Sequence, residues 1–276
     1  MRIAAGRWSV SEQIKSKKQE EQTMLNKVEV YYFSPTGGTA KVGKLFAEAV
    51  AEEAAMIDLG AKVSFPEVPG SDVIVAAAPV FGGRIPGVVS EKLSQLVGTG
   101  KKAVTLAVYG NRAYEDALLE LNDVLAERGF EIAASGAFIA RHSIVPEVAA
   151  GRPVEQDIVE IKDFAGEVLR KLENAPDHEL QIPGNRPYKP EMNVPAAPIS
   201  LPACNLCGKC AKVCPTDAIC LNDGAVQTDT EKCILCMACT NACPRHARIL
   251  PPPMQENMNQ KLGGLKAVRG KNERFL

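Results

Sequence analysis

Residues 31–41 read YYFSPTGGTAK, and this stretch indicates the fold of the N-terminal half of the chain. It joins a strand-like run at 28–34 to a segment at 38–53 whose apolar residues recur at helical spacing. Hydroxyl groups and glycines crowd into the junction, where glycine lets backbone N–H groups approach an anion at a helix N-terminus. We interpret the junction as a phosphate cradle formed by Ser34, Thr36, Gly37, Gly38 and Thr39.

The cradle matches neither of two common nucleotide-binding motifs. A triphosphate loop reads G-x-x-x-x-G-K-[ST], and a dinucleotide loop reads G-x-G-x-x-G. The pattern in this stretch is S-x-T-G-x-T, which has no lysine or magnesium site built in. It favours a single terminal phosphate; the alternative interpretation is an ordinary turn between a strand and a helix.

Strand-like and helix-like segments alternate beyond this junction. This alternation predicts a parallel sheet with helices on both faces, and such sheets bind ligands at the carboxyl ends of their strands. The expected strands are 28–34, 55–59, 73–78, 103–108 and 132–139, and the expected helices are 38–53, 88–96, 113–128 and 154–173.

The cradle and this alternation closely resemble those of flavodoxins over 27–173. The resemblance implies a doubly wound five-stranded parallel sheet in the order 2-1-3-4-5, with the phosphate of FMN in the cradle. It also implies that the loops after the third and fourth strands hold the isoalloxazine ring. The ring contacts expected from those loops are Pro79, Val80, Phe81, Gly82, Gly83, Tyr109, Gly110, Asn111, Arg112 and Tyr114.

Several of these side chains have a second interpretation. Each of the three aromatic residues, Phe81, Tyr109 and Tyr114, either stacks on the flavin or belongs to the core. Arg84 and Arg112 face the flavin, face a partner's acidic surface or lie on a solvated rim. Flavodoxins often flank the ring with Trp and Tyr, but the only Trp of this chain is Trp8, in the N-terminal arm. Arg141 and His142, after the fifth strand, contact a substrate or the C-terminal domain, or lie on the surface.

All nine cysteines lie between Cys204 and Cys243. Eight of them form two copies of C-x2-C-x2-C-x3-C, each followed by proline and offset by 29 residues. This pattern is typical of [4Fe–4S] ligation in two-cluster ferredoxins, in which the fourth cysteine of each run binds the other cluster. The expected ligand sets are Cys204, Cys207, Cys210 and Cys243 for one cluster, and Cys233, Cys236, Cys239 and Cys214 for the other.

Zinc sites are the alternative, but zinc motifs use cysteine pairs separated by longer loops. Cys220 lies outside the pattern and is expected to pack as a small apolar residue, and His246 is expected at the surface. The cysteine segment resembles two-cluster bacterial ferredoxins over about 50 residues. That resemblance implies a small α+β domain that transfers single electrons at low potential.

The composition divides the chain into five parts. We expect a disordered extension at 1–23, a flavodoxin-like domain at 24–174, a proline-rich linker at 175–200, a ferredoxin domain at 201–250 and a tail at 251–276. The tail is either a frayed end or a segment that packs back on the first domain. Whether the extension belongs to the native protein is left open, since Met24 directly precedes the first expected strand region.

The net charge of −1 gives no reason to expect a nucleic-acid partner, and no apolar run approaches the roughly 20 residues that span a bilayer. No signal-peptide pattern is present, so we expect a cytoplasmic location. The oligomeric state is left open.

The whole chain resembles the flavodoxin–ferredoxin fusion proteins of anaerobic bacteria and archaea. The resemblance implies FMN, two [4Fe–4S] clusters and redox proteins as partners, such as a ferredoxin, a reductase or an acceptor enzyme. The favoured function is an electron carrier; the alternative is a flavin-dependent reductase of a quinone, nitro compound or enone. No paired acid–base residues are visible in the expected flavin loops, so no catalytic residue is predicted.

Overall fold

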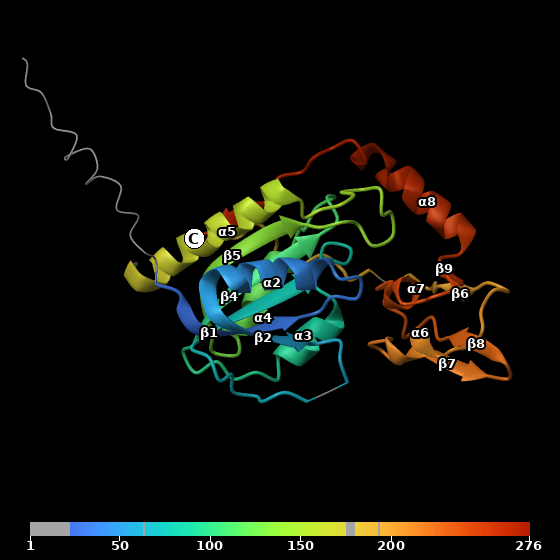
Figure 1. Cartoon of the computed structure of the whole chain (residues 1–276), viewed down its shortest axis with the longest axis horizontal. Coiled ribbons are helices and arrows are strands. Elements are labelled where there is room, and N and C mark those ends of the chain that lie inside the picture. The colour runs from blue at the N-terminus through green and yellow to red at the C-terminus, as the bar shows by residue number, and fades with distance from the viewer. Residues whose placement is uncertain (1–22, 63, 175–179, 193) are drawn as a thin grey trace, which may run out of the picture.

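The structure is a computed structural model that describes residues 23–62, 64–174, 180–192 and 194–276. It consists of a large N-terminal α/β unit and a smaller cysteine-rich unit that lies beside one end of the sheet (Figure 1). Apart from Thr23, the extension expected at 1–23, with its Trp8, lies outside the described residues. Within the described parts of the chain, no helix is long and apolar enough to cross a membrane.

The N-terminal unit is built on a sheet of six strands. These are β1 (Leu25–Tyr32), β2 (Ala51–Asp58), β3 (Val73–Pro79), β4 (Lys102–Tyr109), β5 (Glu131–Ile139) and β10 (Glu273–Phe275). The first five are parallel and lie in the order β2-β1-β3-β4-β5, which confirms the predicted order. Strand β3 reads VIVAAAP and is buried along nearly its whole length, as expected for a strand covered on both faces.

Two helices cover each face of the sheet. On one face lie α2 (Gly38–Val50) and α5 (Glu155–Asn174), which meet through the rings of Phe46 and Phe164 with centroids 5.4 Å apart. On the other lie α3 (Gly87–Leu93) and α4 (Ala117–Ala126). The four predicted helices are therefore present, but α2 ends earlier than predicted because β2 follows it directly.

All five predicted parallel strands are present, and a sixth strand joins them at the edge of the sheet. Strand β10 comes from the C-terminal tail and pairs antiparallel with β5. Its three residues are too few to show a period-2 pattern, so no strand could be predicted there. Of the two alternatives for the tail, the structure therefore shows the one in which it packs back on the first domain.

A buried ion pair fixes the tail to the N-terminal unit. Arg152 and Asp157 are 8% and 1% exposed and bind each other. The Arg152 Nη1 donates to the carbonyl of Gly270 at 2.9 Å, and Arg269 and Asn272 also donate to Asp157. Burial alone would raise the pKa of Asp157, but hydrogen bonds from Arg152 and Val154 hold that pKa below its usual range.

We expect Asp157→Asn to lower the free energy of unfolding by about 3–5 kcal/mol, because it leaves the buried Arg152 guanidinium without its counter-charge. Denaturation in urea measures the change, with Asp163→Asn as the control because Asp163 is exposed on the same helix. Since the folded pKa of Asp157 is depressed, its contribution is present above the unfolded value of about 3.9 and is lost as pH falls through the folded pKa. If Asp157→Asn lowered the free energy of unfolding no more than Asp163→Asn does, the buried ion pair would not stabilise the fold as stated.

The cysteine-rich unit contains two small antiparallel pairs and two short helices, which confirms the α+β expectation. Strand β6 (Ile199–Ser200) pairs with β9 (Arg248–Ile249), and β7 (Ile219–Asn222) pairs with β8 (Ala225–Thr228). The helices are α6 (Lys209–Lys212) and α7 (Ala238–Asn241). The tail then forms α8 (Pro252–Leu262) and the 3₁₀ turn η2 (Gly263–Leu265) before it reaches β10.

The described part of the proline-rich linker is pinned to the start of α4. The backbone N–H groups of Asn185 and Lys189 donate to the Asp116 carboxylate at 2.9 and 2.7 Å. Arg84 donates to the carbonyl of Lys189 at 2.6 Å and forms an ion pair with the buried carboxylate of Glu120. Arg84 is thus neither a flavin contact nor a solvated rim charge: it fastens the linker across the carboxyl edge of the sheet.

Candidate cofactor-binding site

The predicted phosphate cradle opens into a cavity at the N-terminus of α2. Gly37 precedes the helix with φ of 92°, a left-handed conformation that favours glycine. The backbone N–H of Ala40 donates to the Ser34 Oγ at 2.9 Å, which leaves the hydroxyl proton of Ser34 free to donate. The narrow cavity in front of this loop, called here the cradle cavity, has a volume of about 60 Å³. Its lining from the loop consists of Ser34, Pro35, Thr36, Gly38 and Thr39.

Cationic side chains lie on the outer side of the same loop. A polar cavity of about 400 Å³ there is lined by Thr36, Gly37, Gly38, Lys41 and Arg141, among others. The Lys41 Nζ donates to the carbonyl of Pro153 at 2.9 Å, which holds its charge close to the loop. Backbone N–H groups, hydroxyls and these two cations together suit a doubly charged phosphate.

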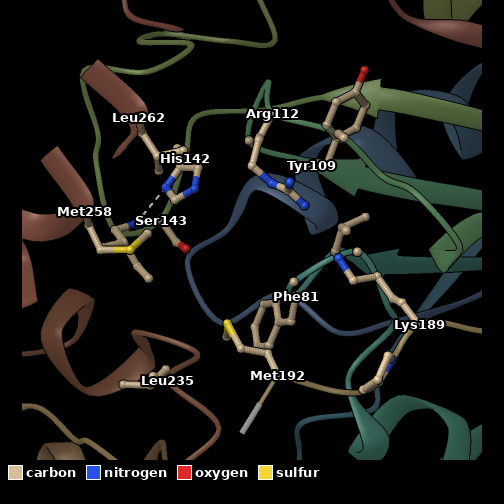
Figure 2. A pocket seen from close by; sticks show the side chains of 17 residues that line it. Phe81, Tyr109, Arg112, His142, Ser143, Lys189, Met192, Leu235, Met258 and Leu262 are labelled. Atoms are coloured by element: carbon tan, nitrogen blue, oxygen red, sulfur yellow. Dashed lines mark hydrogen bonds between the residues drawn. The ribbon is translucent and has the colours of Figure 1, made fainter. Parts of the chain in front are cut away.

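A larger cavity, called here the ring cavity, lies at the carboxyl ends of β3, β4 and β5 (Figure 2). Its volume of about 450 Å³ falls within the range of about 300–1,000 Å³ that is typical of small-molecule sites. It shares part of its lining with the cradle cavity, so the two cavities adjoin each other. The shared residues are Val80, Phe81, Tyr109, Gly110, His142 and Ser143.

Most of the residues predicted to contact the ring line one of these two cavities. Val80, Phe81, Gly82, Gly83, Tyr109, Gly110 and Arg112 line the ring cavity, and Pro79 lines the cradle cavity. Tyr109 contributes only part of its ring, because its hydroxyl points away from the cavity and donates to the carbonyl of Lys271 at 3.2 Å. Burial raises the pKa of Tyr109 to about 12, so this hydroxyl stays protonated at neutral pH.

Two predicted contacts, Asn111 and Tyr114, line neither cavity. The Asn111 Nδ2 donates to the carbonyl of Val268 at 2.7 Å, and its Oδ1 accepts from the N–H of Gly270 at 2.9 Å. The Tyr114 hydroxyl donates to Glu273 at 2.8 Å, and its ring packs edge-on against Tyr109. Both side chains therefore bind the tail, whose position the sequence left open, and lie outside the two cavities.

His142 is held in one tautomer at the wall of both cavities. Its Nδ1 accepts hydrogen bonds from the backbone N–H groups of Ile144 and Val145, both at 3.1 Å. Burial lowers the pKa of His142, and the nearby charge of Arg112 lowers it further. A neutral ring that accepts at Nδ1 carries its proton on Nε2, and that nitrogen is turned toward the Arg112 side of the cavity (Figure 2).

Segments far along the chain close the ring cavity. Their residues come from the linker, the second cysteine loop and the tail helix α8, and sequence reasoning did not assign them to the site. The apolar residues of α8 that face the cavity recur at i and i+4, a signal that is visible in the sequence but too short to interpret alone. These lining residues are Lys189, Pro190, Met192, Leu235, Met258 and Leu262.

The four thiols expected to bind the second cluster surround one small cavity. Cys214, Cys233, Cys236 and Cys239 all line it, although Cys214 belongs to the first cysteine run. Burial raises the pKa of Cys236 to about 12, and the thiols of Cys239, Cys214 and Cys233 add to that rise, as expected for neighbours. No group of three or more His, Cys, Asp or Glu side chains among the described residues converges closely enough to hold a single metal ion. Four cysteine thiols around one cavity are the ligand set that a [4Fe–4S] cluster takes.

The other four thiols differ in their exposure to solvent. Cys210 is buried, Cys204 and Cys243 are half-buried, and Cys207 is exposed. Cys220 is exposed and lines none of the cavities described above. The prediction that it packs as a small apolar residue is therefore wrong. His246 is exposed, in agreement with the expected surface position.

The second cysteine loop also touches the N-terminal unit. Cys236 lines the cradle cavity, and Leu235 lines the ring cavity. Cys236 and Ala238 belong to the same apolar core as Phe33 and Ile85 of the N-terminal unit. Cys236 therefore lines both the cavity of the four thiols and the cradle cavity.

Comparison with protein-family models decides the nature of the cysteine-rich unit. Residues 198–220 and 226–249 each match the 4Fe-4S binding domain. Residues 198–249 are a 4Fe-4S ferredoxin domain. The ferredoxin domain follows an N-terminal unit with the flavodoxin-like strand order, so the chain fits the flavodoxin–ferredoxin fusion that its sequence resembles.

Solved structures with similar folds match the N-terminal half. Flavodoxin 1 from Bacillus cereus is 18% identical with a TM-score of 0.42, and the match covers 52% of this chain and 98% of that one. A flavodoxin from the domain Archaea is 14% identical with a TM-score of 0.39, covering 54% and 99%. Rubredoxin oxygen:oxidoreductase from Desulfovibrio gigas is 19% identical with a TM-score of 0.40. The match covers 55% of this chain but only 37% of that protein. No curated protein matches the chain.

Similarity at this level carries no argument about cofactor or activity. The fold assignment depends on the strand order and on the helices that cover both faces of the sheet.

Proposed function

We propose that this chain is an electron-transfer protein that binds FMN at the sheet and two [4Fe–4S] clusters in the ferredoxin domain, and exchanges electrons with partner redox proteins. The observation that carries the proposal is the position of the second cysteine loop. Cys236 lines the cradle cavity and Leu235 lines the ring cavity, so the expected ligands of one cluster adjoin the expected flavin site. FMN takes up one or two electrons and each cluster one, which would link one-electron and two-electron partners.

Residues of this chain would hold FMN in the two adjoining cavities. The loop 34–39 would bind the phosphate through hydroxyls and backbone N–H groups, with Lys41 and Arg141 as counter-charges. Phe81, Met192 and Leu235 would exclude water from the ring, and the Nε2–H of His142 is a fixed hydrogen-bond donor at its edge.

The proposed cluster ligands keep the crossed arrangement. Cys214, Cys233, Cys236 and Cys239 would bind the cluster near the flavin, because they surround one cavity. Cys204, Cys207, Cys210 and Cys243 would bind the outer cluster, whose loop includes an exposed cysteine.

A reductase of a small substrate is the second candidate. The observation in its favour is His142, whose protonated nitrogen lines the ring cavity and is a donor that a substrate could use. Against it, the linker, Leu235 and α8 close that cavity, which leaves less room for a substrate beside a flavin ring.

An anaerobic stopped-flow experiment tests the proposal. The loaded chain is mixed with a one-electron reductant while cluster and flavin absorbance are followed separately. We expect the clusters to be reduced first and the flavin to follow in a concentration-independent step. A flavin that is reduced only in proportion to external reductant contradicts transfer within the chain. Steady-state reduction of a quinone, nitro compound or enone by the loaded chain, with the same one-electron reductant as electron source and no partner protein, would favour the reductase instead.

A further inference from the structure

The two cysteine runs provide a comparison within one chain, because equivalent positions are 29 residues apart. Leu206 and Leu235 occupy the same place and share the left-handed backbone conformation, with φ of 56° and 53°. Leu235 is 6% exposed, whereas Leu206 is 40% exposed. The next cysteines differ in the same way, since Cys236 is buried and Cys207 is exposed.

The covered loop shows what such a loop can contact. Leu235 and Cys236 meet an apolar cavity that we assign to a redox cofactor, at the carboxyl edge of a sheet. The first loop, 204–210, presents Leu206 and Cys207 at the equivalent positions, with the same left-handed backbone at the leucine, and no cavity described above covers it. Val213, 39% exposed, adds apolar surface beside it.

Charge distinguishes the two loops. The short helix α6 carries Lys209 and Lys212, both exposed, next to Cys207. The equivalent positions of α7 are Ala238 and Asn241. Neither lysine forms an ion pair with another residue of the described chain, whereas Asp217, the nearby acid, is paired with Lys62.

We infer that the exposed loop 204–210, flanked by Lys209 and Lys212, is a docking surface for a second redox protein whose cofactor lies beside an apolar surface with an acidic rim. The inference rests on the proposed function, because the loop must hold the outer cluster. Complementary charge would steer the encounter. Leu206 would then pack against the partner's apolar surface, as Leu235 packs at the wall of the ring cavity.

The test uses a strongly acidic bacterial ferredoxin, in its reduced form, as electron donor to the fully loaded chain. At low salt, Lys209→Glu with Lys212→Glu should lower the second-order rate constant about tenfold and weaken its dependence on ionic strength. The matched control is Lys162→Glu with Lys261→Glu, which changes the net charge equally at two exposed positions elsewhere. Leu206→Ser should raise the dissociation rate without changing the salt dependence.

The outcomes separate the two proposals. Equal slowing by both pairs of substitutions assigns the effect to net charge and overturns the docking surface, as does no slowing by either. Failure of the unmodified chain to bind iron, or to transfer electrons to its flavin from a small reductant, overturns the proposed function instead.

An independent observation concerns Arg248, a charged residue that follows the second cysteine run. The first run has an uncharged residue at the equivalent position. The equivalent residue of the first run is Ile219, an apolar core residue 8% exposed. Arg248 is even more buried, at 3% exposed, yet it forms no ion pair with a carboxylate of the described chain. An unpaired buried charge is strongly unfavourable, so it requires a compensating negative charge nearby.

The surroundings of Arg248 show where that charge belongs. Its Nη1 donates to the Ser200 Oγ at 3.0 Å and its Nη2 to the Thr228 Oγ1 at 2.8 Å, while its Nε has no partner. The guanidinium lies within electrostatic reach of the thiols of Cys233, Cys239 and Cys243. Those cysteines come from the expected ligand sets of both clusters.

The structure assigns to Arg248 the role of a fixed positive charge that raises the reduction potential of the neighbouring clusters. Reduction adds one electron to a group already made negative by four thiolates, so a fixed cation beside it favours the reduced form and raises the potential. The two hydroxyl acceptors hold the guanidinium in place without neutralising it.

Potentiometric titration of the loaded chain, followed by electron paramagnetic resonance, tests this role. Arg248→Ile, which copies the first run, and Arg248→Gln should each lower the electron affinity of at least one cluster about tenfold, or 59 mV for a one-electron couple. Arg248→Lys should stay close to the unmodified chain. Loss of iron from both neutral variants but not from Arg248→Lys also supports charge compensation. Unchanged potentials at full iron content overturn the role, and so does loss of iron from all three variants, since that would make Arg248 structural.

Discussion

Replacing Cys214 with alanine is expected to remove the cluster nearer the flavin while leaving the outer cluster in place. Cys214 belongs to the first run, but its thiol lines a cavity with Cys233, Cys236 and Cys239 of the second. Loss of one of four thiolates opens the cluster to solvent and to loss of iron. We expect about four of eight iron atoms to remain after purification, and reduction of the flavin by an external one-electron donor to slow about 100-fold because the adjoining cluster is missing.

The control is Cys220→Ala, because Cys220 is exposed and stands outside both runs. It should keep all its iron and its rate of flavin reduction. Iron analysis and the electron paramagnetic resonance spectrum of the reduced protein distinguish the clusters. If Cys214→Ala instead loses the cluster of the exposed loop, the crossed ligation is wrong and each run binds its own cluster.

Replacing Gly37 with aspartate is expected to abolish FMN binding. A Cβ at Gly37 would meet no heavy atom within 4 Å, so steric exclusion within the chain is not the reason. The new carboxylate would face the phosphate at the start of α2, where repulsion between the two anions weakens binding about 100-fold or more. Titration of the apoprotein with FMN, followed by flavin fluorescence, measures the effect.

Gly37→Asn separates charge from backbone strain. Asparagine has the shape of aspartate and tolerates the left-handed φ of 92° better than most residues, but it carries no charge. We expect its dissociation constant to lie within about tenfold of that of the unmodified chain. Equal affinities of the Asp and Asn variants for FMN would show that the phosphate does not bind at this loop.

The sequence predicts those features that depend on local patterns. The alternation of strands and helices predicts a parallel sheet, the resemblance to flavodoxins predicts the order of its strands, and the spacing of the cysteines predicts the ferredoxin domain. The residues at the carboxyl ends of β3 and β4 line the ring cavity because parallel strands place these loops at one edge. Prediction and structure therefore agree best for features that follow from local sequence patterns, such as the strands and the loops at their carboxyl ends.

The remaining parts depend on contacts between distant segments. Strand β10 has three residues and is stable only because β5 offers it a free edge, so nothing in its own sequence indicates a strand. Asn111 and Tyr114 follow β4, which is where the resemblance places ring contacts. Their polar groups instead form hydrogen bonds with the tail. Met192, Leu235 and Met258 reach the ring cavity from three separate segments, and no local pattern relates these residues to one another.

The most direct test of the account is an anaerobic absorption spectrum of the purified chain, with iron, sulfide and flavin measured per polypeptide. The account predicts about eight iron, about eight sulfide and one FMN. Eight iron without FMN, even after reconstitution with the flavin, would contradict it: the cavities at the sheet would then belong to another ligand, and the ferredoxin domain would have no flavin to exchange electrons with.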